Sequence, residues 1–224
     1  NLRDSRPRFH GLRTLSQKMV RDRLALYSFI YLVLMLFVIV AASLVAPYDH
    51  TTGDVWQRLK PPAWVEGGSA QHLLGTDQQG RDVLSRLIWG GQVSLRVGFV
   101  VVFLAASVGI TLGLLAGYAG GRVESVIMQL VDIQFAFPGM LVALVFVMVL
   151  GPGEFNLIIA LAFNGWMVFA RMARGLVLNF RNGPMVEAAQ AIGVQPLMIM
   201  FKHILPNIFS PMVTLFVLEV ARII

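Results

Sequence analysis

Long uncharged apolar runs alternate with short polar segments along the chain. Three runs carry no charged residue: Leu24 to Tyr48, Val97 to Gly121 and Ile133 to Gly153. Each is longer than the roughly 20 apolar residues with which a helix crosses about 30 Å of hydrocarbon. The weaker pattern of membrane strands, about 10 alternating residues each, does not appear. Because unpaired backbone groups are costly in lipid, the pattern predicts an all-α, polytopic membrane helix bundle.

The runs predict five membrane spans. In chain order they are about Leu24–Ala46, Val93–Tyr118, Ser125–Leu150, Leu157–Ala170 (longer if the run to Leu178 continues it) and a fifth from near Pro206 to the end. Pro138 is expected to kink the third span, because proline removes one backbone hydrogen bond. The residues from about 49 to 87 are polar and contain Pro61-Pro62, so a loop outside the membrane is expected there.

The basic residues predict the orientation of these spans. Residues 1–23 hold seven Lys or Arg against two Asp, and residues 171–206 hold four against Glu187 alone. The positive-inside rule therefore predicts a cytoplasmic N-terminal segment at 1–23 and a transmembrane domain at 24–224, with a cytoplasmic loop at about 171–206 and an external loop at about 49–87. A basic arm can also bind nucleic acid, but directly before an apolar run it is typical of a cytoplasmic flank, so no nucleic-acid partner is expected.

The amino-acid composition limits the kinds of chemical site that the chain can form. The chain is 57% hydrophobic and 13% charged, whereas soluble domains average about 25% charged residues. It has no cysteine, which excludes disulfides and thiolate metal sites, and its four histidines are scattered: His10, His50, His72 and His203. It has no phosphate-binding glycine loop with Lys and Ser/Thr and no serine nucleophile motif. We therefore expect no catalytic, cofactor-binding or metal-binding residue in this chain.

Small residues recur every four positions in the second span, at Gly109, Gly113 and Gly117, with Ala105 before them. Such a stripe lies on one helix face and lets a neighbouring backbone approach closely, so we expect this face to pack against protein. Val101 and Val102 are expected to face lipid instead. Asp132, early in the third span, is expected near the cytoplasmic edge, with a role in transport coupling as the less favoured alternative.

The external loop contains a run rich in turn-forming and charged residues: Gly75, Thr76, Asp77, Gly80, Arg81, Asp82, Ser85 and Arg86. It lacks the third ligand position and the final Glu of a calcium-binding EF-hand loop. Asp77, Arg81 and Asp82 are instead expected to pair with each other and to cap the following helix.

The cytoplasmic loop predicts two short helices. Pro184 precedes a run of strong helix-forming residues. Glu187 lies in the first turn of the predicted helix, where a negative charge interacts favourably with the helix dipole. Gly193 can end this helix. A second helix, about Gln195 to His203, would lead to Pro206 at the start of the next span. These helices would form a compact cytoplasmic knob, in which small Ala188 and Ala189 let a partner surface come close.

A family resemblance rests on two of these motifs. Glu187-Ala188-Ala189, then Gly193, then Leu205-Pro206 resembles the EAA loop of binding-protein-dependent importer permeases, although His203 stands where the usual pattern has an apolar residue. The ending His203 to Asn207 and the run from Gly75 to Arg86 resemble the dipeptide/oligopeptide/nickel subgroup, and nearly the whole chain looks like its C-type subunit.

The resemblance implies the type I ABC importer permease fold, with five of six spans present and a sixth beyond Ile224, in a bacterial inner membrane. It implies a non-enzymatic subunit that forms half of a pore for peptides or a related solute and couples through its EAA loop to ATPases. Its partners would be a second permease in a heterodimer, two ATP-binding subunits that hold ATP and Mg, an extracytoplasmic substrate-binding protein and the lipid bilayer.

The alternative is a stand-alone secondary transporter or an intramembrane enzyme. Either would need polar groups near mid-membrane, and outside the third span the sequence offers Asn164, Glu219 and Arg222. The sequence does not name the substrate.

Overall fold

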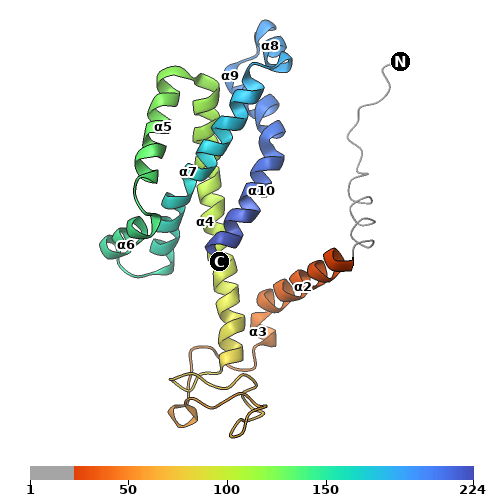
Figure 1. Ribbon diagram of the computed structural model, residues 1–224, viewed down its shortest axis with the longest axis vertical. Coiled ribbons are helices and arrows are strands. Elements are labelled where there is room, and N and C mark those ends of the chain that lie inside the picture. Colours follow the sequence, from red (N-terminus) through yellow and green to blue (C-terminus); the bar gives the residue numbers. More distant parts are fainter. Residues whose placement is uncertain (1–22) are drawn as a thin grey trace. The chain divides into compact units, whose positions relative to one another are not determined.

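The computed structural model describes residues 23–224, and this range is mostly helical (Figure 1). Its elements are α2 (Arg23–Val40), α3 (Ala42–Val45), the 3₁₀ turn η1 (Val55–Gln57), α4 (Val83–Ala119), α5 (Gly121–Phe135), α6 (Gly139–Leu150), α7 (Glu154–Arg181), α8 (Pro184–Ala191), α9 (Pro196–Met198), the π-helical turn η2 (Ile199–Ile204) and α10 (Leu205–Ile223). Within this range the β-structure is a single isolated bridge between Thr76 and Asp82. The predicted cytoplasmic segment 1–23 falls, except for its last residue, outside the described residues.

The predicted all-α membrane bundle is confirmed, although two spans differ from expectation. Three helical stretches are long and apolar enough to cross a membrane: α4, α7 and the continuous stretch Pro196–Ile223. The pair α5 and α6 meets the same test together but bends by 88°. The first predicted span is shorter than expected, because its apolar helix ends at Val40 and a turn at Ala41 separates it from α3.

The bend between α5 and α6 is much sharper than the predicted kink. Pro138 has no N–H and disfavours helical backbone at the residue before it. Accordingly α5 ends at Phe135, and Pro138 caps the start of α6. The third span is therefore broken, with three non-helical residues between its two halves.

Two helices are longer than predicted. The α4 helix begins at Val83 rather than near Val93, and α7 continues to Arg181, so the predicted loop at 171–206 is helical in its first third. Between α7 and α10 the chain contains only the short elements α8, α9 and η2.

The chain divides into two compact units, residues up to Val93 and Ser94–Ile224. In the first unit, Trp89 of α4 stacks on His50 with ring centroids 4.8 Å apart. In the second unit, α7 contacts α5, α6, η2 and α10 (Figure 1). Its largest buried cluster joins five elements, with members Leu114, Ala173, Val177, Val186, Ala189, Ile199, Met200, Ile204, Ile208 and Met212.

The expectation that Val101 and Val102 face lipid is wrong. Their exposed fractions are 0% and 1%. Val102 packs with Ala105, Ala106 and Phe169 of α7, because these residues of α4 share one helix face with the small-residue stripe. Apolar character alone could not separate this face from the outward-facing Phe99 and Phe103, which are more than half exposed.

Candidate functional sites

The loop between α7 and α10 begins with α8, whose ends follow its sequence. Pro184 occupies the first turn, where its missing N–H has no helical partner to lose, and Glu187 lies in the same turn, exposed. At the other end Gly193 has φ +77°. Its N–H donates to the Gln190 carbonyl at 3.0 Å and the Val194 N–H to the Ala189 carbonyl at 3.0 Å. This is the Schellman arrangement that stops a helix with glycine in the left-handed region.

We call residues 184–204 the knob; it has a buried root and an exposed apolar surface. Val186 and Ala189 are buried in the cluster shared with α4, α7 and α10, so Ala189 lies inside the knob whereas Ala188 is on its surface. Five large apolar side chains of the knob are at least 45% exposed: Met185, Ile192, Leu197, Met198 and Phe201. The knob is therefore anchored in the helix bundle by its root and presents an apolar surface outward.

The predicted second short helix is not a separate element. It is α9 followed by η2, and both continue without a break into α10. The Leu205 N–H donates to the Met200 carbonyl, five residues earlier, as a π-helical turn requires. Pro206 lies in the first turn of α10, where Leu205 is partly buried, and the Asn207 side chain donates to the His203 carbonyl at 2.6 Å. Proline here follows the π turn instead of starting a new helix.

The 49–82 loop is organised around two aspartates, of which Asp77 is the first. Its carboxylate accepts the backbone N–H groups of Gln79 at 2.8 Å and Arg81 at 3.0 Å, and the Arg81 Nε–H at 2.9 Å. It also pairs with Arg86. Desolvation raises the pKa of Asp77, but the hydrogen bonds from Arg81 and Gln79 and the Arg81 charge outweigh it and lower that pKa to about 2.

Asp82 is the second aspartate and is almost fully buried. It accepts the Ser85 N–H at 2.8 Å and the Ser85 hydroxyl at 2.7 Å, which makes it the N-terminal cap of α4. Its other oxygen lies 3.0 Å from His72 Nδ1, and His72 Nε2 lies 2.9 Å from Gln57 Oε1. Desolvation raises the pKa of Asp82, but the Ser85 and His72 interactions outweigh it and lower the pKa. The expected cap is present, but the partner of Asp82 is His72 rather than Arg81.

His72 was missed because its ten-residue separation from Asp82 fits no local motif. The turn residues around it bring the two together. Gly80, with φ +75°, lies so close to the Asp54 backbone that a Cβ would be only 3.0 Å from the Asp54 nitrogen. The Thr76 hydroxyl accepts the Lys60 N–H at 2.9 Å and donates to the Gln57 carbonyl, while the Thr76 N–H donates to the Lys60 carbonyl at 3.1 Å.

We call the contacts of Gly109, Gly113 and Gly117 with α7 the α4–α7 seam. A Cβ at Gly109 would lie 2.6 Å from the Phe169 Cβ, and one at Gly113 would lie 2.7 Å from the Ala173 Cβ. At Gly117 the same atom would lie 2.7 Å from the Val177 Cβ. No larger residue fits at these three positions without moving α7.

Two ion pairs join α5 to α7. Arg171 pairs with Asp132, and its guanidinium carbon lies 4.3 Å from the centre of the Phe135 ring. Arg174 pairs with Glu124, with its Nε 2.7 Å from the carboxylate. In α10, Arg222 pairs with the buried Glu219 at 2.6 Å. Among residues 23–224, no three His, Asp or Glu side chains gather as a metal site would require.

Two known protein families match parts of the chain. Residues 13–62 match the N-terminal transmembrane domain of oligopeptide transport permease C. Residues 109–224, which include the seam and the knob, match the binding-protein-dependent transport system inner membrane component.

Three curated relatives illustrate the similarity. The dipeptide transport system permease protein DppC of Haemophilus influenzae is 37% identical over 86% of this chain and 65% of its own length. The di/tripeptide transport system permease protein DppC of Pseudomonas aeruginosa is 40% identical over 88% and 65%, and the oligopeptide transport system permease protein OppC of Bacillus subtilis is 34% identical over 83% and 59%. The chain thus spans less than two thirds of the length of these relatives. Together with the apolar helices, the match over residues 109–224 confirms the predicted multi-pass membrane protein, and the chain belongs to the binding-protein-dependent transport system inner membrane components.

Proposed function

We propose that this chain forms half of the translocation pathway of an ATP-driven importer for peptides or a related small solute. Permeases for dipeptides, oligopeptides and glutathione are among its relatives. ATP and Mg would be bound by two partner ATPase subunits, and solute would arrive from an extracytoplasmic binding protein through a heterodimer with a second permease. This chain carries out no covalent step in the proposal.

The single observation that carries the proposal is the knob. Its exposed apolar side chains, including Ile192 at 81% exposure, would be costly to leave in water, and Glu187 and Ala188 are exposed in the same knob. Its root is buried against three long helices. A partner ATPase that pushes on this surface would therefore move α4, α7 and α10 together, which is what alternating access requires of a coupling element.

The proposal is tested in the assembled transporter, with ATPase co-purification and ATP-dependent peptide uptake into vesicles as readouts. Ile192→Asp should weaken ATPase binding by about tenfold or more, since losing a buried apolar anchor of an interface exceeds 1.4 kcal/mol. Glu187→Lys should weaken it too, by reversing the charge in the first turn of α8. Gln195→Asp, an exposed change in the same knob, is the matched control. Normal ATPase binding and uptake by both variants would reduce the knob to a connector.

A further inference from the structure

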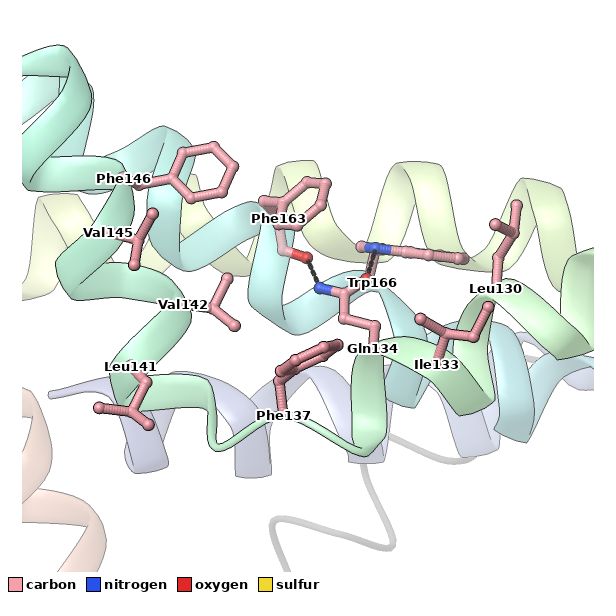
Figure 2. A pocket seen from close by; sticks show the side chains of 10 residues that line it. All are labelled: Leu130, Ile133, Gln134, Phe137, Leu141, Val142, Val145, Phe146, Phe163 and Trp166. Atoms are coloured by element: carbon pink, nitrogen blue, oxygen red, sulfur yellow. Dashed lines mark hydrogen bonds between the residues drawn. The ribbon is translucent and has the colours of Figure 1, made fainter.

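The α5 helix has two exposed faces of opposite character. Ser125, Gln129 and Asp132 recur at helical spacing on one exposed face. One position later along the chain, the exposed apolar residues Val126, Leu130 and Ile133 recur with the same spacing. Leu130 and Ile133 line an apolar cavity of about 550 Å³ between α5, α6 and α7, into which Phe137, Val142 and Phe163 also point (Figure 2).

The α7 helix continues the polar face. Arg171, Gly175 and Asn179 are exposed and four residues apart, so they form one stripe along the helix. All three line a second cavity, of about 530 Å³, together with Phe135 of α5 and Leu215 of α10. The Arg171–Asp132 ion pair joins this stripe to the polar face of α5. We call the two together the polar stripe: Ser125, Gln129, Asp132, Arg171, Gly175 and Asn179.

The charged pair of the polar stripe lies within two candidate membrane spans, the bent pair α5 and α6 and the helix α7. Asp132 is eleven residues after the start of α5, and Arg171 is ten residues before the end of α7. At 1.5 Å per residue both lie about 15 Å along the helix axis from those helix ends. Half or more of each side chain is nevertheless exposed, 67% for Asp132 and 51% for Arg171. Charged groups at such depth face water or protein rather than lipid.

The break between α5 and α6 supports water at this place. Residues 136–138 are exposed, non-helical and only a few positions beyond Asp132. Irregular backbone at membrane depth is tolerated where it is buried in protein or lines a water-filled cavity. An exposed ion pair, an adjacent cavity to which Arg171 and Asn179 contribute polar groups, and an exposed backbone break therefore lie close together.

We propose that the polar stripe lines the aqueous path of the importer, and that Arg171 and Asp132 at its midpoint contact the carboxylate and ammonium ends of a passing peptide. The inference rests on the proposed function. The opposite charges of the pair match the two ends of a zwitterion. The Phe135 ring under the guanidinium holds Arg171 on the cavity side. The apolar face of α5 would lie against lipid or a neighbouring helix.

Adjacent positions supply matched tests of the water path. Because the parent has no cysteine, Gln129→Cys and Leu130→Cys each introduce the single thiol of this chain, as do Ser125→Cys and Val126→Cys. In the assembled transporter, a small charged methanethiosulfonate should react about tenfold faster at 125 and 129 than at 126 and 130, because the thiolate is the nucleophile and apolar surroundings suppress it. Modification at 129 should also block uptake. Equally slow reaction at all four positions would show that a partner helix covers the stripe and would overturn the inference. The parent's own ATP-dependent uptake tests the proposed function separately.

A second test addresses the charged pair. Uptake of a dipeptide is compared with uptake of its C-terminal amide in the parent and in the variants Arg171→Gln and Arg171→Lys. The same binding protein is used throughout, so that the binding protein's preference for one of the two peptides affects all three transporters equally. Arg171→Gln should lower the dipeptide-to-amide uptake ratio about tenfold, in line with the loss of one charge-assisted hydrogen bond. Arg171→Lys should retain most of the ratio. An unchanged ratio in Arg171→Gln would overturn the contact with the peptide carboxylate.

Discussion

The 49–82 loop and the α4–α7 seam are both closely packed, but different interactions hold them. In the loop, two aspartates collect hydrogen bonds from backbone and side chains up to ten residues away, and Ser85, which donates to Asp82, also accepts the Tyr48 N–H from 37 residues away. In the seam, the three glycines of α4 carry no side chain, and their backbone meets the backbone and the Cβ atoms of α7. The difference reflects the solvent: in water, directional bonds fix an irregular loop, whereas in lipid, close van der Waals contact is what joins helices.

The seam should be the more sensitive region to added volume. Gly113→Leu would drive a side chain into Ala173 and the Ala170 backbone, and such overpacking costs about 3 kcal/mol or more. We expect a large loss of folded protein and of assembled complex, measured as the yield after size-exclusion chromatography. Gly90→Leu, in the same helix but with no atom within 4 Å of its Cβ position, is the control. A normal yield of Gly113→Leu would show that the seam can separate.

The loop should be the more sensitive region to loss of a polar group. Asp82→Ala removes the cap of α4 and leaves the buried His72 without its carboxylate, at a cost of about 2 kcal/mol. We expect faster amide hydrogen exchange across the loop and at the start of α4, with the seam unaffected. Asp49→Ala, at an exposed carboxylate that contacts its near neighbours His50 and Thr51, is the control and should leave exchange at the start of α4 unchanged.

Glycine can be required at a position either by close packing or by backbone conformation, and Gly193 distinguishes the two. Unlike the seam glycines, it has no neighbour within 4 Å of a Cβ position, but its φ is +77°. Gly193→Ala should therefore cost only about 1 kcal/mol through backbone strain, while Asn, which tolerates this region better, should cost less. The thermal unfolding midpoint of the purified chain measures both. A loss as large as that of Gly113→Leu would mean that hidden packing, not conformation, selects this glycine.

The smallest effect concerns the pH dependence of the loop. The folded pKa of Asp77 is lowered from 3.8 to about 2, so its contribution to stability is complete above about pH 5 and is lost as the pH falls through 4 toward 2. Because the group is at the surface, salt should weaken the effect. Hydrogen exchange of the Gln79 and Arg81 amides should speed up over this range in the parent, and Asp77→Asn should remove that dependence. A parent profile that is flat down to pH 2 would contradict the assignment.

The sequence predicted the helices well where one physical signal dominates. A charge-free run located α4, the apolar segment from Pro206 onward located α10, and the glycine after a helix-forming run located the end of α8. It left open whether α7 ends near Ala170 or continues to Leu178, because Arg171 and Arg174 look like the end of a span until their partners Asp132 and Glu124 are known. The helix in fact continues to Arg181. The lipid-facing assignment of Val101 and Val102 failed for a related reason, since an apolar side chain fits both lipid and a protein interior.

The candidate sites likewise divide into features that follow from the local sequence and features that depend on long-range contacts. Local features, such as the cap by Asp82 and the turn at Gly193, follow from residues only a few positions apart. The pairing of His72 with Asp82, the burial of Ala189 and the continuity of α9 with α10 depend on contacts that no short motif encodes. The polar stripe was also hidden, because its residues come from two helices, α5 and α7, which are joined by the ion pairs Arg171–Asp132 and Arg174–Glu124.

The π-helical turn before Pro206 sets the register in which the knob joins α10. A π turn accommodates one residue more than an α-helical turn at the same place. Deleting a single residue between 199 and 204 would restore α-helical register and turn α9 by about 100° around the helix axis relative to α10. Because Ile199, Met200 and Ile204 are buried in the cluster shared with α4, α7 and α10, the knob would then have to repack. A one-residue insertion or deletion in this turn would therefore change the apolar surface that the knob presents to a partner.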